Sequence, residues 1–143
     1  MSELRVMQRK RSKIIIDTNL WISYLITKEF KRLDKLIFSD KARLIFSQEL
    51  IDEFIEVAER PKFRKYFSSM DMAKLLEIFD TYGEFVKVKS NIEICRDLKD
   101  NFLLSLSIDS QADFLITGDN DLLELKNFGK TKILSIVEFQ SLY

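Results

Sequence analysis

The sequence predicts an α/β fold, a three-layer α/β/α sandwich around a mainly parallel central sheet. Two uncharged runs, residues 14–16 and 114–117, are rich in β-branched and aromatic side chains, as strands buried on both faces are. Segments with helical periodicity lie between such runs, and this alternation is typical of a parallel sheet covered by helices. Acidic residues follow both runs, at the sheet edge where such folds bind ligands.

Length and composition restrict the class of protein. The 143 residues suit one domain, and we divide them into a basic extension over 1–12, expected to be flexible, and a single domain over 13–143. No apolar stretch approaches the ~20 residues of a membrane span, and the start lacks the apolar centre of a signal peptide. The single cysteine, Cys95, fits a reducing cytoplasm. The absence of histidine excludes Ser-His-Asp and Cys-His catalysis and most zinc sites.

The first half of the domain is expected to contain two strands and three helices. In chain order these are a strand over 13–17, a helix to about residue 27, a helix over 30–38, a strand over 42–46 and a helix that ends near residue 60. Thr18 or Asn19 can cap the first helix, and Ser47 is a good N-cap for the third. Pro61 disfavours helix in the residue before it and therefore ends the third helix.

The second half is expected to continue the same alternation. In chain order we predict a helical turn over 62–67, a helix over 69–82, a strand over 85–89, a helix over 101–109 after a turn over 97–100, a strand over 112–117, a short helix over 121–125, a strand over 132–135 and a C-terminal helix. Gly83 can end the helix before it. The strand over 85–89 alternates apolar and charged residues, and Ser135 with Glu138 forms a capping box.

The charges are unevenly distributed although their sum is zero. Residues 1–13 hold five basic side chains against one acid, whereas residues 91–125 hold eight acids against only Arg96 and Lys99. The basic extension is either a disordered tail or a segment that attracts phosphate or a partner.

Five acids occupy positions from which they could converge. Asp17 ends the first strand, Glu53 lies in an apolar part of its helix, Asp100 begins a helix, and Asp119 and Asp121 follow the 112–117 strand. Each has an ordinary explanation alone, as a helix N-cap, a turn former or an ion-pair partner. Together they favour an oxygen-only site for Mg²⁺ or Mn²⁺, the kind of site that hydrolyses phosphodiesters by activating water and stabilising the leaving oxygen.

Four segments follow one another in an order and spacing that resemble the PIN-domain family. They read Ile-Ile-Asp-Thr-Asn at 15–19, Ser-Gln-Glu-Leu-Ile-Asp-Glu at 47–53 with Arg-Pro-Lys-Phe at 60–63, Cys-Arg-Asp-Leu-Lys-Asp-Asn-Phe-Leu-Leu at 95–104, and Ala-Asp-Phe-Leu-Ile-Thr-Gly-Asp-Asn-Asp-Leu-Leu at 112–123. The resemblance runs from about Lys13 to the end of the chain. The nearest branch is that of VapC-like ribonucleases, the toxin components of bacterial toxin–antitoxin systems.

The resemblance implies a Mg²⁺- or Mn²⁺-dependent endoribonuclease that acts as the toxin of such a pair, with an antitoxin partner and a homodimeric state. It implies four catalytic and metal-binding acids, with a fifth assisting the metal: Asp17, Glu53, Asp100 and Asp119, assisted by Asp121. It further implies that Asn19 and Thr117 orient the carboxylates or a water, and that Asp97 forms a turn. Leu98 stands where many relatives have proline, and residues 1–12 extend beyond the usual family start.

One further group of residues is a candidate for RNA binding. Arg60, Lys62, Arg64 and Lys65 are interleaved with aromatic residues, a combination that can hold single-stranded RNA. The alternative is a helix with its aromatic side chains in the core and its charges in water.

Other functions remain open alongside the toxin ribonuclease. A haloacid-dehalogenase-like phosphatase also begins with an apolar strand that ends in Asp, but it requires a second Asp where this chain has Asn19. A non-catalytic scaffold of the same fold that binds RNA or protein is a second alternative. An RNA-processing nuclease without a toxin role is a third.

Overall fold

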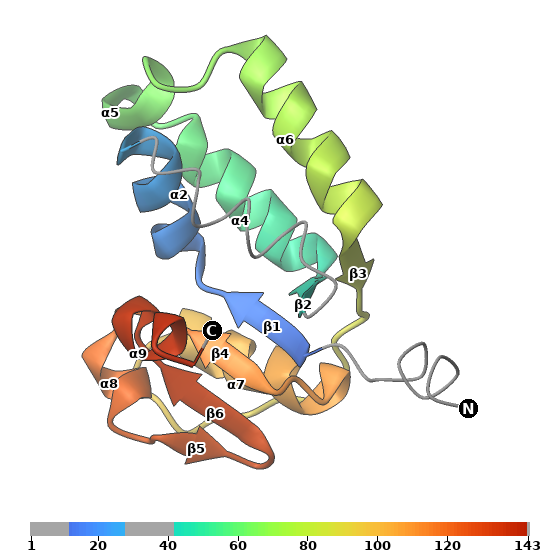
Figure 1. Ribbon diagram of the computed structural model, residues 1–143, viewed down its shortest axis with the longest axis vertical. Helices are drawn as coiled ribbons and strands as arrows, with labels where there is room; N and C mark the ends of the chain where they lie inside the picture. Colours follow the sequence, from blue (N-terminus) through green and yellow to red (C-terminus); the bar gives the residue numbers. More distant parts are fainter. Residues whose placement is uncertain (1–11, 28–41, 143) are drawn as a thin grey trace.

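A six-stranded sheet forms the centre of the molecule in the computed structural model, which describes residues 12–27 and 42–142 (Figure 1). The strand order is β3-β2-β1-β4-β6-β5, and every described pair is parallel except β5–β6. The strands are β1 (Ser12–Ile16), β2 (Ala42–Phe46), β3 (Gly83–Phe85), β4 (Phe114–Ile116), β5 (Asn127–Phe128) and β6 (Thr131–Leu134). The predicted mainly parallel sheet is therefore confirmed.

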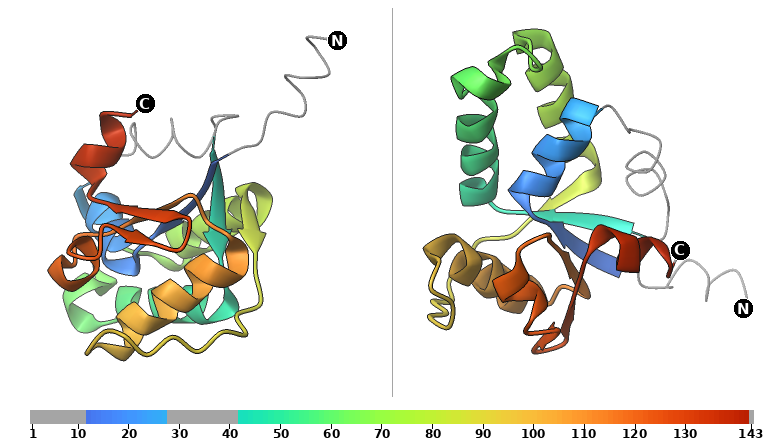
Figure 2. Two further views of the ribbon diagram at one scale, coloured as in Figure 1. Left: turned by 90° about the horizontal axis from the view of Figure 1, so that it is seen from below. Right: turned by 90° about the vertical axis from the view of Figure 1, so that its left-hand side faces the viewer.

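Helices cover both sides of this sheet, as a three-layer sandwich requires. They are α2 (Thr18–Thr27), α4 (Gln48–Ala58), α5 (Pro61–Arg64), α6 (Ser69–Tyr82), α7 (Leu98–Ser110), α8 (Asn120–Leu123) and α9 (Ile136–Gln140). Figures 1 and 2 show α7 and α9 on opposite faces of β4 and β6. The expected helix over 30–38, and the expected basic extension apart from Ser12, lie outside the described residues.

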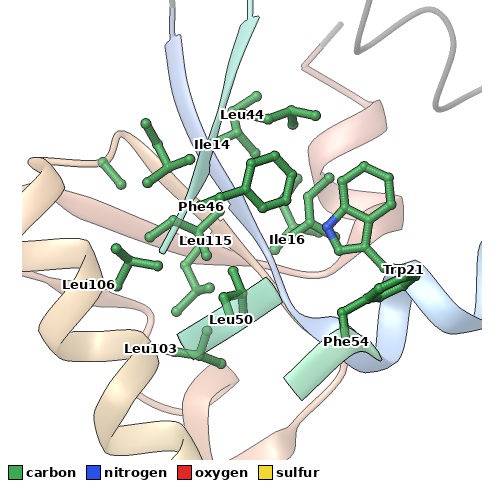
Figure 3. Packing of buried hydrophobic residues seen from close by; sticks show 14 of the residues in the cluster. Ile14, Ile16, Trp21, Leu44, Phe46, Leu50, Phe54, Leu103, Leu106 and Leu115 are labelled. Atoms are coloured by element: carbon green, nitrogen blue, oxygen red, sulfur yellow. The ribbon is translucent and has the colours of Figure 1, made fainter. Parts of the chain in front are cut away.

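The buried core explains why the two uncharged runs sit at the centre of the sheet. Ile14, Ile15 and Leu115 have no exposed surface, since helices cover both faces of β1 and β4. Figure 3 shows the cluster between leucines of α7 and the rings of Trp21 and Phe46. Burial of such side chains contributes about 1.5–3 kcal/mol each. The packing of helices against both faces of the sheet therefore stabilises β1 and β4 side by side.

The predicted strand over 85–89 is wrong beyond its first residue. The sheet strand covers only Gly83–Phe85, and residues 86–97 have no regular secondary structure. The neighbouring strand β2 ends at Phe46, which is paired with Phe85, so β3 has no strand to pair with beyond that residue. Side chains of α7 then accept backbone N–H groups of the loop that follows. Asp109 accepts the N–H groups of residues 89 and 90, and the Ser105 hydroxyl accepts that of Ile92.

Gly83 ends α6 as predicted, but for a steric reason and not for a left-handed backbone. Its φ is −96°. A Cβ atom here would lie 2.5 Å from the Phe79 carbonyl oxygen and 2.6 Å from a ring carbon of Phe46. We therefore expect Gly83→Ala to lower the free energy of unfolding by about 1–3 kcal/mol through overpacking. Urea denaturation checks this, with Gly118→Ala as the control, since a Cβ there meets nothing within 4 Å.

Candidate metal centre

Asp17 is held at the carboxyl end of β1 by two kinds of backbone contact. Its N–H continues the strand ladder to the Ile116 carbonyl at 3.0 Å, and its carbonyl accepts the N–H groups of Leu20 and Trp21 in the first turn of α2. Its Oδ1 accepts the N–H of Asn19 at 3.2 Å. The helix cap is therefore Asp17, not Thr18 or Asn19 as predicted. The Asn19 side chain itself is exposed.

Asp100 lies in the first turn of α7 with its side chain free of the capping role. Asp97 is the N-cap instead and accepts the N–H of Lys99 at 2.9 Å, so the N-cap explanation of Asp100 is wrong and the helix begins three residues earlier than predicted. Asp100 is 2 % exposed, and its Oδ2 has no hydrogen-bond partner among the described residues. Burial, together with the charges of Asp119 and Asp97, raises the pKa of Asp100 to about 6.

The turn after β4 brings two more acids to Asp100. Asp119 caps α8, where its Oδ1 accepts the N–H groups of Asp121 at 2.8 Å and Leu122 at 3.3 Å. Asp100, Asp119 and Asp121 each offer a carboxylate oxygen, and these oxygens lie within 4.8 Å of one another. Arg96, which is exposed, contacts both carboxylate oxygens of Asp121, at 3.4 and 3.2 Å. The group is called the acidic triad below.

Thr117 connects the ends of β1 and β4. Its hydroxyl donates to Oδ2 of Asp17 at 2.9 Å and accepts the N–H of Asp119 at 3.1 Å. The residue has no exposed surface. One buried hydroxyl therefore fixes the orientation of a strand-end carboxylate relative to the turn that carries the triad.

Lys99 lies between Asp17 and Glu53, a contact that the sequence interpretation missed. Its Nζ is 3.3 Å from Oδ1 of Asp17 and 3.1 Å from Oε1 of Glu53, and its side chain is 24 % exposed. Burial alone would lower the pKa of Lys99, but the carboxylates of Asp17 and Glu53 outweigh it and raise the pKa. The only signal in the sequence was that Lys99 is one of two basic residues in the acidic stretch 91–125.

The basic residues proposed for RNA binding lie apart from these carboxylates. Arg60, Lys62, Arg64 and Lys65 are all exposed on and around α5. Figures 1 and 2 show α5 at the end of α4 remote from the sheet. The neighbouring aromatic residues differ in burial: Phe63 and Phe67 pack against the core, whereas Tyr66 is 39 % exposed.

The triad fits a hard divalent cation on the chemistry of its donors. All of its ligand atoms are carboxylate oxygens, which suit Mg²⁺ or Mn²⁺ better than zinc. Three acids this close repel one another unless a cation neutralises them. No donor in the described part of the chain satisfies the buried Oδ2 of Asp100, which is therefore available as a ligand atom. A divalent ion would both coordinate this oxygen and remove the repulsion among the three acids.

The structure thus combines a mainly parallel sheet between helices with acids gathered at the carboxyl ends of its central strands. A family model described as PIN domain matches residues 13–121, so the chain belongs to the PIN-domain family. The chain is also similar to the uncharacterized protein MJ1680 of Methanocaldococcus jannaschii, with 34% identity over 128 residues, 87% of this chain and 81% of that protein. PIN domains are generally metal-dependent nucleases that act on RNA, so membership implies nuclease activity. Among the described helices, none is long and apolar enough to cross a membrane.

Proposed function

We propose that this protein is a Mg²⁺- or Mn²⁺-dependent endoribonuclease whose active site is the carboxylate group at the ends of β1 and β4. The acidic triad would hold the ion, and Asp17 and Glu53 would complete the active site. The observation that carries the proposal is Asp100, a buried carboxylate beside two further acids, with one oxygen that has no partner within residues 12–27 and 42–142. A fold alone would not carry it, because function resides in the site.

The chain's own residues would orient the reaction. When bound, the ion would make a water more acidic and stabilise negative charge on the phosphate and leaving oxygen. Asp119 is held by two N–H groups at the start of α8, so its carboxylate is fixed before an ion binds. Thr117 fixes Asp17 in the same way. The ammonium of Lys99 contributes positive charge at a place where an RNA phosphate has to approach carboxylates.

Cleavage of end-labelled RNAs tests the proposal. We would incubate the protein with structured and single-stranded RNAs, and with a matched single-stranded DNA, in Mn²⁺, Mg²⁺ or EDTA. Internal cuts in RNA that require the metal support an endoribonuclease. Cleavage that persists in EDTA contradicts it, and intact metal binding without any cleavage favours the non-catalytic scaffold.

Thr117→Val is expected to lower the rate of RNA cleavage by about 10–100-fold, the usual cost of losing a group that orients a metal ligand. Valine keeps the volume but removes the donor to Asp17 and the acceptor for the Asp119 N–H. Initial rates at saturating Mn²⁺ measure the effect. Thr117→Ser retains the hydroxyl and serves as the matched control, and equal rates for valine and serine would contradict the orienting role.

We further propose the biological role of a toxin with a cognate antitoxin and a homodimeric state, which the sequence resemblance supports. Induced expression in a bacterial host tests it. Growth arrest by the wild-type protein but not by Asp17→Asn supports a toxin, whereas unimpaired growth with active enzyme favours an RNA-processing nuclease.

The four basic residues around α5 are proposed to bind the RNA strand at a distance from the cut. Glu53 lies five residues before Ala58, the end of α4, which is a rise of about 7–8 Å, and Arg60 follows two residues later. An RNA that contacts both sites would therefore lie along α4. The exposed ring of Tyr66 offers a surface on which a base can stack.

A further inference from the structure

We propose that the ammonium group of Lys99 takes the position of a second metal ion, so that the centre binds a single divalent cation, in the acidic triad. The inference rests on the metal centre of the proposed function and adds its stoichiometry. Two-metal nucleases place their ions about 3.5–4 Å apart and share carboxylates between them. In this protein the carboxylates of Asp17 and Glu53 already share a cation, the ammonium group of Lys99.

The contacts of Asp17 leave little room for an ion. Its Oδ1 accepts the N–H of Asn19 and faces the Lys99 ammonium at 3.3 Å. Its Oδ2 accepts the Thr117 hydroxyl at 2.9 Å. Both oxygens of this 3 % exposed residue are thus engaged with donors of the protein.

Lys99 neutralises charge that a second ion would otherwise have to neutralise. Its Nζ contacts Glu53 as well as Asp17, and the side chains that meet there come from β1, α4 and α7. Withdrawing the ammonium would leave a nearly buried carboxylate without its ion partner, which is strongly unfavourable. An ion could enter between Asp17 and Glu53 only at that cost.

The acidic triad offers the opposite situation. Asp100 has a buried oxygen with no partner among the described residues. Asp121 is paired with Arg96, but that side chain is 89% exposed, so water can replace it at little cost. Lys99 and Asp100 are consecutive residues in the first turn of α7. The chain therefore places the fixed positive charge of Lys99 next to Asp100, the residue that would bind the divalent cation.

The number of Mn²⁺ ions bound per chain tests the inference, measured from the electron paramagnetic resonance signal of free Mn²⁺ during titration. We expect one ion for the wild-type protein and two for Lys99→Gln, because the glutamine leaves the Asp17–Glu53 pair without a cation. Lys99→Arg keeps the charge and should bind one ion. Arg96→Gln also removes one positive charge beside the carboxylates, but outside the Asp17–Glu53 pair, and should still bind one.

Two ions on the wild-type protein would overturn the inference, and so would a single ion on folded Lys99→Gln. If circular dichroism shows that Lys99→Gln does not fold, the wild-type and Lys99→Arg stoichiometries decide. The measurement is independent of catalysis. One bound ion without RNA cleavage would refute the proposed ribonuclease but support the single-ion inference. Two bound ions with RNA cleavage would support the ribonuclease but refute the single-ion inference. No ion on the wild-type protein would refute both the triad site and this inference.

Discussion

Asp100→Asn is expected to abolish RNA cleavage and at the same time to stabilise the metal-free protein. Loss of one preorganised group that stabilises charge typically costs roughly 10²–10³-fold in rate, and Asp100 supplies the unpartnered ligand oxygen of the triad. Asparagine is nearly isosteric, so the packing around α7 should remain. It also carries no charge, so the repulsion from Asp119 and Asp97 disappears.

Two measurements on the same preparation check this result. Initial cleavage rates at saturating Mn²⁺ report the loss of activity, and thermal denaturation in EDTA at pH 7 to 8 reports the gain in stability. Asp97→Asn is the matched control, because it removes a nearby charge while asparagine can still cap α7. A variant at position 100 that cuts RNA like the wild type would contradict the role of Asp100, and one that melts lower in EDTA would contradict the repulsion.

Protonation of Asp100 is expected to contribute stability to the metal-free protein as the pH falls from about 6 to about 4. The pKa of Asp100 is raised from 3.8 to about 6 by burial and by neighbouring acids. The folded state therefore binds this proton more tightly than the unfolded state, and stability rises as the pH falls through the folded-state pKa. A shift of about two units corresponds to a gain on the order of 2–3 kcal/mol.

Urea denaturation in EDTA across this pH range measures the effect. Hydrogen bonds with Ser90 lower the pKa of Asp109, and hydrogen bonds with Ser135 lower that of Glu138, so both acids work in the opposite direction. The informative quantity is therefore the difference between the wild-type protein and Asp100→Asn, in which these two contributions cancel. That difference should shrink towards zero as the pH falls below 6. A difference that is constant from pH 4 to pH 8 would contradict the raised pKa.

Strand positions could be predicted from the sequence because they depend on local composition. The uncharged runs at 14–16 and 114–117 have no stable place except a sheet buried on both faces. The predicted caps Ser47 and Ser135 are also confirmed, since each accepts a backbone N–H at the start of its helix. The acids at the strand ends could be predicted in the same way, since parallel strands bring their carboxyl ends to one edge.

The missed features depend on contacts between distant parts of the chain. The alternation at 85–89 resembles a strand, and only the packing of α7 shows that Asp109 and Ser105 accept the backbone donors of the following loop. The contact of Lys99 with Asp17 and Glu53 depends on how β1, α4 and α7 meet, which no spacing in the sequence encodes. The short antiparallel strand β5 has too few residues to produce a pattern.

We propose above that the carboxylates at the ends of β1 and β4 make this PIN domain a metal-dependent ribonuclease. The most direct measurement compares RNA cleavage by the wild-type protein and by Asp17→Asn at saturating Mn²⁺, with circular dichroism to confirm that both are folded. We expect metal-dependent cleavage by the wild type and none above background by the folded variant. Equal cleavage by the two proteins would contradict the assignment of this site.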